Sequence, residues 1–96
     1  MFVVRNVFKC KPGQAKNVIG KFKAAHELMA DTIGKPRLLV DEVADFWTVV
    51  VEVEVKDIAK FEEALRERGS RDDVKNAMAG YLDMVVSGYR EVFRVV

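Results

Sequence analysis

The sequence predicts an α+β fold in which a four-stranded antiparallel sheet has its helices on one face. Three observations support this prediction: apolar and polar residues alternate at both ends of the chain, apolar residues between the strands recur at helical spacing, and the centre is rich in valine. Residues 46–55 include five valines, whose β-branched side chains suit a pleated surface. The resulting order, β-α-β-β-α-β, is that of a split βαβ unit.

The first half of the chain predicts one strand followed by one long helix. Residues 2–10 alternate as a strand does, and Pro12 and Gly13 end it because proline donates no ladder hydrogen bond and glycine permits a turn. From residue 14 to about residue 33, apolar side chains recur at steps of three or four. Gly34 predicts the C-terminal end of this helix.

The centre of the chain predicts a pair of antiparallel strands. Residues 37–44 form a weaker strand, and Asp45 turns the chain into the strand 46–55. So short a link favours antiparallel pairing. The period of two places Trp47 beside the alternate valines, on the face that the helices cover.

Two shorter helices and a last strand complete the prediction. Asp57 is a predicted N-cap of a helix that ends at Gly69, and Ser70 is a predicted N-cap of the next helix. Two aspartates then lie in the first turn, where the helix dipole favours negative charge. The last strand begins near Gly88 and runs to Val96.

Length and charge limit the classes of function. The 96 residues predict one domain, 1–96, and the net charge of +1 comes from sixteen basic and fifteen acidic residues spread along the chain. No basic block predicts nucleic-acid binding, and no segment has the roughly 20 apolar residues of a membrane helix. The strand-like start predicts no signal peptide, and the lone cysteine, Cys10, fits a reducing compartment. We therefore expect a soluble cytoplasmic protein.

The sheet face without helices predicts a homodimer. Valines on this face alternate with charged residues, a surface too apolar for water and too charged for a dry core. Two copies packed through it would bury the valines and pair arginines with glutamates. The alternative is a solvated face with cross-strand ion pairs. The predicted open-face residues are Val3, Arg5, Val7, Thr48, Val50, Glu52, Glu54, Arg90, Val92 and Arg94.

The whole chain resembles the dimeric α/β-barrel superfamily of ferredoxin-like proteins, which includes antibiotic-biosynthesis-type monooxygenases, NIPSNAP-like proteins and haem-degrading monooxygenases. The resemblance depends on the opening residues 1–6, the strand end at 11–13, and the valine-rich strand that leads to residues 61–65. It implies that two sheets close into a dimeric barrel and that each subunit holds a cavity between sheet and helices.

The haem-degrading branch fits this chain poorly. That branch uses an asparagine on the first strand, which Asn6 matches, a tryptophan late on the third strand, and a histidine on the later helices. The tryptophan position falls near Val55 here, and residues 57–84 contain no histidine. We therefore expect neither haem nor another cofactor.

Four residues are the predicted ligand contacts: Asn6, His26, Trp47 and Tyr89. His26 lies on the apolar stripe of the first helix and is the residue whose ordinary pKa is closest to neutral. Asn6 is polar on an otherwise apolar strand face, so it either orients a ligand or satisfies backbone groups. The two aromatics, and Tyr81 with them, either line the same cavity or belong to the core. No second or third ligand accompanies His26, so no metal site is predicted.

The sequence leaves two functions open, and it identifies no catalytic residue. The first is a cofactor-independent monooxygenase-like enzyme that acts on a small aromatic or polycyclic substrate. The second is a non-catalytic ligand-binding or stress-related module whose dimer is its main feature. The size of the cavity distinguishes them, because a void of several hundred cubic ångströms supports a ligand site.

Overall fold

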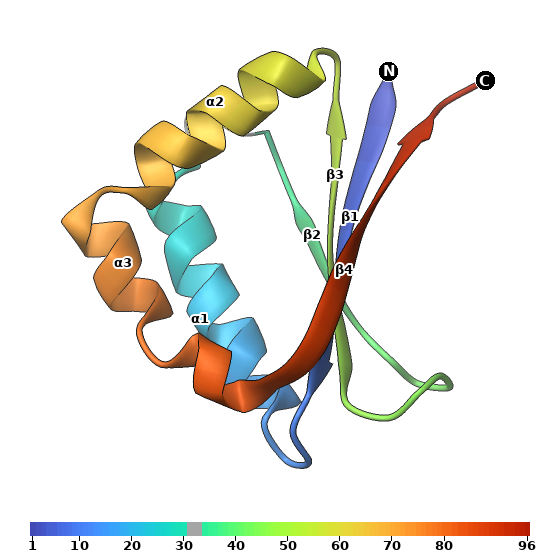
Figure 1. Cartoon of the computed structure of the whole chain (residues 1–96), viewed down its shortest axis with the longest axis vertical. Helices are drawn as coiled ribbons and strands as arrows, with labels where there is room; N and C mark the ends of the chain where they lie inside the picture. Colours follow the sequence, from blue (N-terminus) through green and yellow to red (C-terminus); the bar gives the residue numbers. More distant parts are fainter. Residues whose placement is uncertain (31–33) are drawn as a thin grey trace.

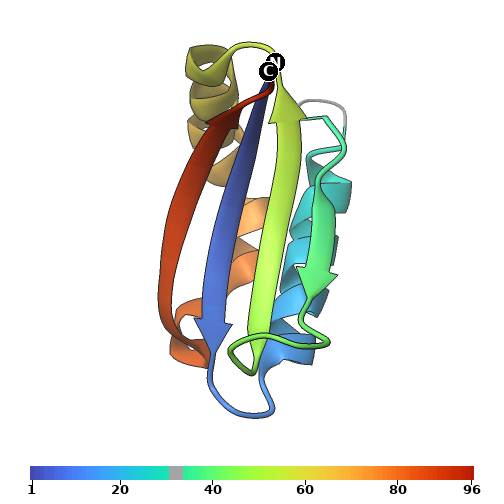
Figure 2. The ribbon, with the colours of Figure 1, turned by 90° about the vertical axis from the view of Figure 1, so that its right-hand side faces the viewer.

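A computed structural model describes residues 1–30 and 34–96. Four antiparallel strands form one sheet in the order β2-β3-β1-β4, and all the helices pack on one of its faces (Figures 1 and 2). This confirms the predicted βαββαβ arrangement. The elements are β1 (Phe2–Cys10), α1 (Ala15–Leu28), β2 (Arg37–Val40), β3 (Thr48–Val55), α2 (Ile58–Gly69), α3 (Asp72–Met78), the 3₁₀ helix η1 (Tyr81–Met84) and β4 (Val85–Arg94).

The first helix is shorter than predicted. Strand β1 has the predicted bounds, and Gly13 makes the turn after it at a φ of 81°. Helix α1 ends at Leu28, and the N–H of Met29 donates to the carbonyls of Ala25 and His26. Gly34 therefore does not end the helix directly, and residue 33, the last residue of the predicted stripe, lies outside the described residues.

The prediction that residues 46 and 47 begin the central strand is wrong. Strand β2 ends at Val40, and β3 begins at Thr48, whose N–H donates to the carboxylate of Asp41 at 2.9 Å. Trp47 has a positive φ of 60° and is 43% exposed, so it lies in the connecting loop and not over the core. The Nζ of Lys9 donates to the backbone carbonyls of Asp45 and Phe46, which holds this loop against the end of β1.

The two later helices begin close to the predicted positions. The carboxylate of Asp57 accepts from the N–H of Lys60 at 3.0 Å, which confirms it as the N-cap of α2. The predicted N-cap Ser70 is displaced by one residue: Arg71 occupies the N-cap position of α3, while the Ser70 hydroxyl donates to the carbonyl of Glu67. Asp72 and Asp73 lie in the first turn of α3 as predicted.

The predicted face of the last strand is also wrong for three residues. Arg90, Val92 and Arg94 lie opposite Asn6, Val4 and Phe2 of β1. Directly paired residues of neighbouring strands point to the same face, and Val4 belongs to the core beneath the helices. All three residues therefore lie on the helix side of the sheet. The open face instead receives Tyr89, Glu91 and Phe93, opposite Val7, Arg5 and Val3.

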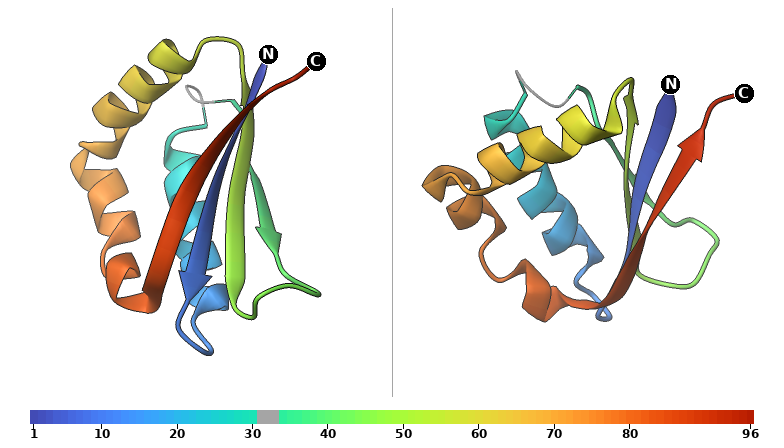
Figure 3. Two further views of the ribbon diagram at one scale, coloured as in Figure 1. Left: turned by 45° about the vertical axis from the view of Figure 1, so that its right-hand side comes forward. Right: turned by 45° about the horizontal axis from the view of Figure 1, so that its top comes forward.

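The buried core beneath the helices consists of two clusters and not one. The first joins the ends of β1 and β3 nearest α2 to α1, α2 and α3, and its buried members are Val4, Ala25, Met29, Val53, Phe61 and Val74. The second lies at the opposite end of the sheet, against the start of α1, and its buried members are Cys10, Ala15, Val18 and Val49. Helices α2 and α3 stand away from the middle of the sheet (Figure 3). The space between the two clusters is the candidate site.

Candidate ligand cavity

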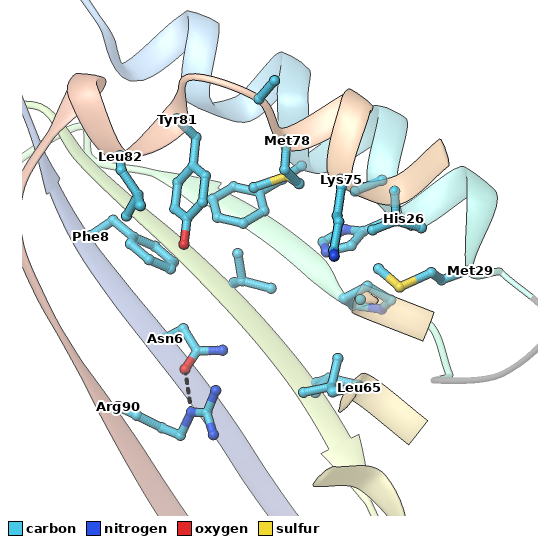
Figure 4. A pocket seen from close by; sticks show the side chains of 18 of the residues that line it. Asn6, Phe8, His26, Met29, Leu65, Lys75, Met78, Tyr81, Leu82 and Arg90 are labelled. Carbon is cyan, nitrogen blue, oxygen red and sulfur yellow. Dashed lines mark hydrogen bonds between the residues drawn. The ribbon is translucent and has the colours of Figure 1, made fainter. Parts of the chain in front are cut away.

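A cavity of about 900 Å³ lies between the helices and the middle of the sheet (Figure 4). This volume falls in the range of small-molecule sites. Side chains of β1, β3 and β4 form its floor, and side chains of α1, α2, α3 and η1 form its walls. Its lining includes the polar, charged and aromatic residues of this region together with two apolar neighbours: Asn6, Phe8, Phe22, His26, Val51, Lys75, Met78, Tyr81, Asp83 and Arg90.

The floor of the cavity is one row of residues across the sheet. Arg90, Asn6 and Val51 are paired across β4, β1 and β3. The neighbouring row on one side is Val92, Val4 and Val53, and the row on the other side is Gly88, Phe8 and Val49. Those flanking rows carry the two apolar clusters. The core is therefore interrupted at the single row that carries an amide and a guanidinium.

Asn6 and Arg90 are joined by a hydrogen bond. The Nε of Arg90 donates to the Oδ1 of Asn6 at 2.6 Å (Figure 4). This bond uses one of the five N–H donors of the guanidinium group and leaves those of its two terminal nitrogens free of any partner among the described residues. The side-chain oxygen of the partly buried Asn6 thus accepts a hydrogen bond that orients Arg90 at the cavity.

Aromatic side chains form the wall at one end of the cavity. The ring of Phe22 lies 5.1 Å from that of Phe8 and 6.1 Å from that of Tyr81, and it stacks on His26 at 5.9 Å between ring centroids. These separations are typical of favourable ring contacts. Gly88 permits the arrangement, because a Cβ there would lie 2.9 Å from the carbonyl oxygen of Val7 and 3.4 Å from the Phe8 ring. The wall offers an apolar surface of mutually tilted rings, with one phenol and one imidazole.

The environment of His26 favours its neutral form. Burial in this wall lowers the pKa of its imidazole below the ordinary value, because the charged form loses hydration. No hydrogen bond joins its ring to another described residue. A neutral imidazole at the cavity surface can accept a proton from a bound molecule.

The charged residues at the cavity are mainly basic. Lys75 of α3 and Arg90 of β4 line it, together with one acidic residue, Asp83 of η1. Within residues 1–30 and 34–96, neither basic residue forms an ion pair with a carboxylate. The cavity therefore combines an apolar body with two solvent-exposed basic side chains, neither of which has a carboxylate partner among the described residues.

The four predicted ligand contacts divide into three cases. Asn6 and His26 both line the main cavity. Trp47 does not line it, since it lies in the loop after β2. Tyr89 borders the main cavity through its edge strand, but the pairing with Val7 directs its side chain to the open face, where it is 62% exposed.

Sequence reasoning missed three residues of the site: Phe22, Lys75 and Arg90. Phe22 was indicated by the apolar stripe of α1, but only as a core residue. The pairing of Asn6 with Arg90 depends on the β1–β4 register, which no local pattern specifies. Tyr81, for which both a cavity and a core position were open, lies in η1 and lines the cavity.

A smaller cavity of about 410 Å³ lies on the open face of the sheet. Lys9, Leu39, Val50 and Tyr89 border it together with the loop after β2. Arg5 lies on the same face, with its Nε 3.6 Å from the Glu52 carboxylate and 3.9 Å from that of Glu91. These ion pairs form between strands of one chain, as the alternative of a solvated sheet face predicts.

Metal-ligating and nucleophilic groups do not gather at either cavity. Among the described residues, no three histidine, cysteine, aspartate or glutamate side chains are placed to hold one metal ion. Burial, and secondarily the Asp41 carboxylate, raise the pKa of the Cys10 thiol, which favours its unreactive form. No helix in the described part of the chain combines the length and apolar character needed to span a bilayer.

Comparison with solved structures supports the fold. No protein-family model and no curated protein matches this sequence. A NIPSNAP family protein from Agrobacterium tumefaciens superposes with a TM-score of 0.87 at 8% identity, covering 99% of this chain and 92% of that protein. An uncharacterised NIPSNAP domain protein from Burkholderia xenovorans gives 0.85 at 7% identity, with coverages of 100% and 95%. An antibiotic biosynthesis monooxygenase gives 0.73 at 18% identity, with coverages of 100% and 99%. These likenesses confirm the resemblance in fold.

Proposed function

We propose that this chain binds a small, flat aromatic or polycyclic molecule in the main cavity and oxidises it with molecular oxygen, without a bound cofactor. The observation that supports binding is the cavity of about 900 Å³, with its wall of three aromatic rings and its few convergent polar groups. The likeness in fold to an antibiotic biosynthesis monooxygenase supports the choice of oxidation.

The proposed reaction begins with proton transfer to His26. A substrate with an acidic methylene group beside an aromatic system gives its proton to the neutral imidazole and becomes a carbanion. This carbanion supplies the electrons that a cofactor supplies in other oxygenases. Overall, one methylene group and one molecule of oxygen give one ketone and one molecule of water. Both C–H bonds of the methylene break and the carbon loses four electrons, while one oxygen atom enters the product and the other leaves as water.

The apolar wall has two roles in this proposal. Phe8, Phe22 and Tyr81 provide an apolar surface of tilted rings against which the substrate packs, and they exclude water from the carbanion. Exclusion of water matters because a carbanion in bulk solvent regains a proton before it meets oxygen. Asn6 and Arg90 fix the orientation of the substrate on the floor.

The experiment separates binding from oxidation. Binding is measured with N-phenyl-1-naphthylamine, a neutral dye whose fluorescence rises in apolar surroundings. We expect saturable binding, which Met78→Trp weakens by at least about tenfold because the indole fills the cavity. Leu39→Trp, on the open face, is the matched control and leaves the affinity unchanged. No saturable binding by the folded wild-type protein would overturn the proposal.

Oxidation is measured with anthrone, a tricyclic ketone with an acidic methylene group. We expect oxygen uptake above the rate with Met78→Trp protein, with one molecule of oxygen consumed per ketone formed and no effect of a chelator. His26→Gln lowers this rate without abolishing dye binding. Dye binding without any oxygen uptake would reject the oxidation and leave the binding module.

A second candidate function is dimerisation through the open face. The observation that favours it is the exposure of Tyr89 and Phe93, 62% and 51%, beside the valines of β1 and β3. A second copy that covered this face would remove these rings from water, at about 25 cal/mol per Å² of apolar surface. A cytoplasmic location fits this module, because the cysteine Cys10 is a free, buried thiol, as is typical of a reducing compartment. Sedimentation equilibrium of the purified protein tests it, and a monomer at micromolar concentration would reject it.

A further inference from the structure

The charges at the cavity define the ligand more closely than its volume does. Arg90 and Lys75 line the cavity, and burial lowers the pKa of His26, which disfavours its charged form. Asp83 is the one acidic lining residue, and no ion pair in the described part of the chain joins it to either basic group. A neutral ligand would use neither basic group, whereas an anionic ligand would gain a charged hydrogen-bond partner.

The strand position of Arg90 and one hydrogen bond orient it towards the cavity. Its place in the floor row puts it on the helix side of the sheet, and the bond to the Oδ1 of Asn6 takes up its Nε. The two terminal nitrogens, which carry the remaining donors, lie at the cavity (Figure 4). A planar guanidinium held in this way presents parallel N–H groups, which match the two oxygens of a carboxylate.

We propose that the ligand is an aromatic carboxylate whose ring system stacks on the wall of Phe8, Phe22 and Tyr81 and whose carboxylate binds the terminal nitrogens of Arg90. This inference rests on the proposed binding function of the same cavity and specifies its ligand class. Asn6 is a positioning residue, because it acts on the ligand through Arg90. Lys75 adds long-range attraction from the rim.

The place of Arg90 in the floor row relates this exposed arginine of an edge strand to the cavity. The corresponding position of the row on one side is Val92, and that on the other side is Gly88. The arginine therefore coincides with the gap between the two core clusters and with the one amide of β1. An arginine with no role at the cavity requires neither coincidence.

The test compares two fluorescent probes of equal size, anthracene-2-carboxylate and its neutral carboxamide, by fluorescence titration at low ionic strength. We expect the wild-type protein to bind the carboxylate about tenfold more tightly than the amide. Arg90→Gln removes this preference and changes the amide affinity by less than about twofold. Asn6→Ala reduces the preference partially, because the guanidinium remains but is no longer held.

Two controls make the result specific. Arg94→Gln removes the same charge from the same strand outside the cavity lining, and we expect the full preference to remain. Lys75→Gln lowers the carboxylate affinity less than Arg90→Gln does. Equal affinities of both probes for the wild-type protein would overturn the carboxylate assignment while leaving aromatic binding intact. Loss of the preference in Lys75→Gln but not in Arg90→Gln would overturn the role of Arg90. Failure of both probes and of the neutral dye would instead reject the proposed function itself.

Discussion

The guanidinium of Arg90 donates to the side-chain oxygen of Asn6 across 84 residues of sequence, and this bond marks the row at which the core of the protein is interrupted. The first and last strands bring the two residues together, because β1 and β4 pair along their whole length in the sheet. On each side of this row the sheet carries apolar residues that the helices cover. The cavity therefore lies above the row that carries the polar pair, between two apolar parts of the core.

Replacement of Asn6 by valine tests whether this row is adapted for function at the expense of stability. Valine has the higher strand propensity and would extend the apolar surface between Val4 and Phe8. Arg90 is exposed enough for water to replace the lost acceptor. We expect Asn6→Val to raise the free energy of unfolding by up to about 1 kcal/mol, measured by urea denaturation, while lowering the affinity for aromatic carboxylates. A loss of stability larger than about 1 kcal/mol would show that the amide is structural.

The lowered pKa of His26 predicts a loss of stability on mild acidification. The unfolded chain takes up a proton near the ordinary pKa of about 6.5, whereas the folded protein does so only at lower pH. Between these two values the unfolded state binds more protons, so the free energy of unfolding falls as the pH falls. We expect the urea midpoint to be lower at about pH 5.5 than at about pH 7.5, and the difference to shrink in His26→Gln. An identical difference in both proteins would contradict the burial of this imidazole.

We predict that replacing glycine by alanine has opposite effects on stability at two positions, Gly88 and Gly20. A Cβ at Gly88 would lie 2.9 Å from a backbone oxygen of β1, so we expect Gly88→Ala to lower the free energy of unfolding by about 1–3 kcal/mol. Gly20 lies within α1, and a Cβ added there would meet open space. Gly20→Ala should therefore raise stability by about 0.5–1 kcal/mol. Thermal denaturation of both variants measures the contrast, and a stabilised Gly88→Ala protein would show that β4 shifts easily against β1.

The order of the elements could be predicted from sequence because each depends on local periodicity. The alternation in residues 2–10 and the helical spacing after Gly13 specify their elements without reference to the rest of the chain. The prediction that Trp47 belongs to the central strand was wrong, and the reason is also local. Aromatic residues favour strands, but here the Asp41 carboxylate holds the N–H of Thr48 and Trp47 adopts a positive φ, so the turn includes it.

The faces of β4 could not be read from its own sequence. Both alternate sets in Val85–Arg94 mix apolar and charged residues, so the hydrophobic pattern does not select a face. The choice is made by the pairing with β1, including the register shift between Lys9 and Cys10. His26 and Asn6 could be identified as candidates because the local patterns of their own elements place them on the helix side. Arg90 could not, because its face depends on the pairing of β4 with β1.

The observed pairing of β4 with β1 also supplies a matched pair of variants for the proposed dimer. Phe93 and Val92 are adjacent and similarly exposed, at 51% and 45%, but they point to opposite faces of the sheet. If two copies pack through the open face, Phe93→Lys places a charge in the interface and should shift the equilibrium towards monomer by at least about tenfold in dissociation constant. Val92→Lys lies on the helix side and should leave the equilibrium unchanged. Sedimentation velocity across a dilution series compares the two. Equal effects of both lysines, or none from Phe93→Lys in a protein that does dimerise, would move the interface away from the open face.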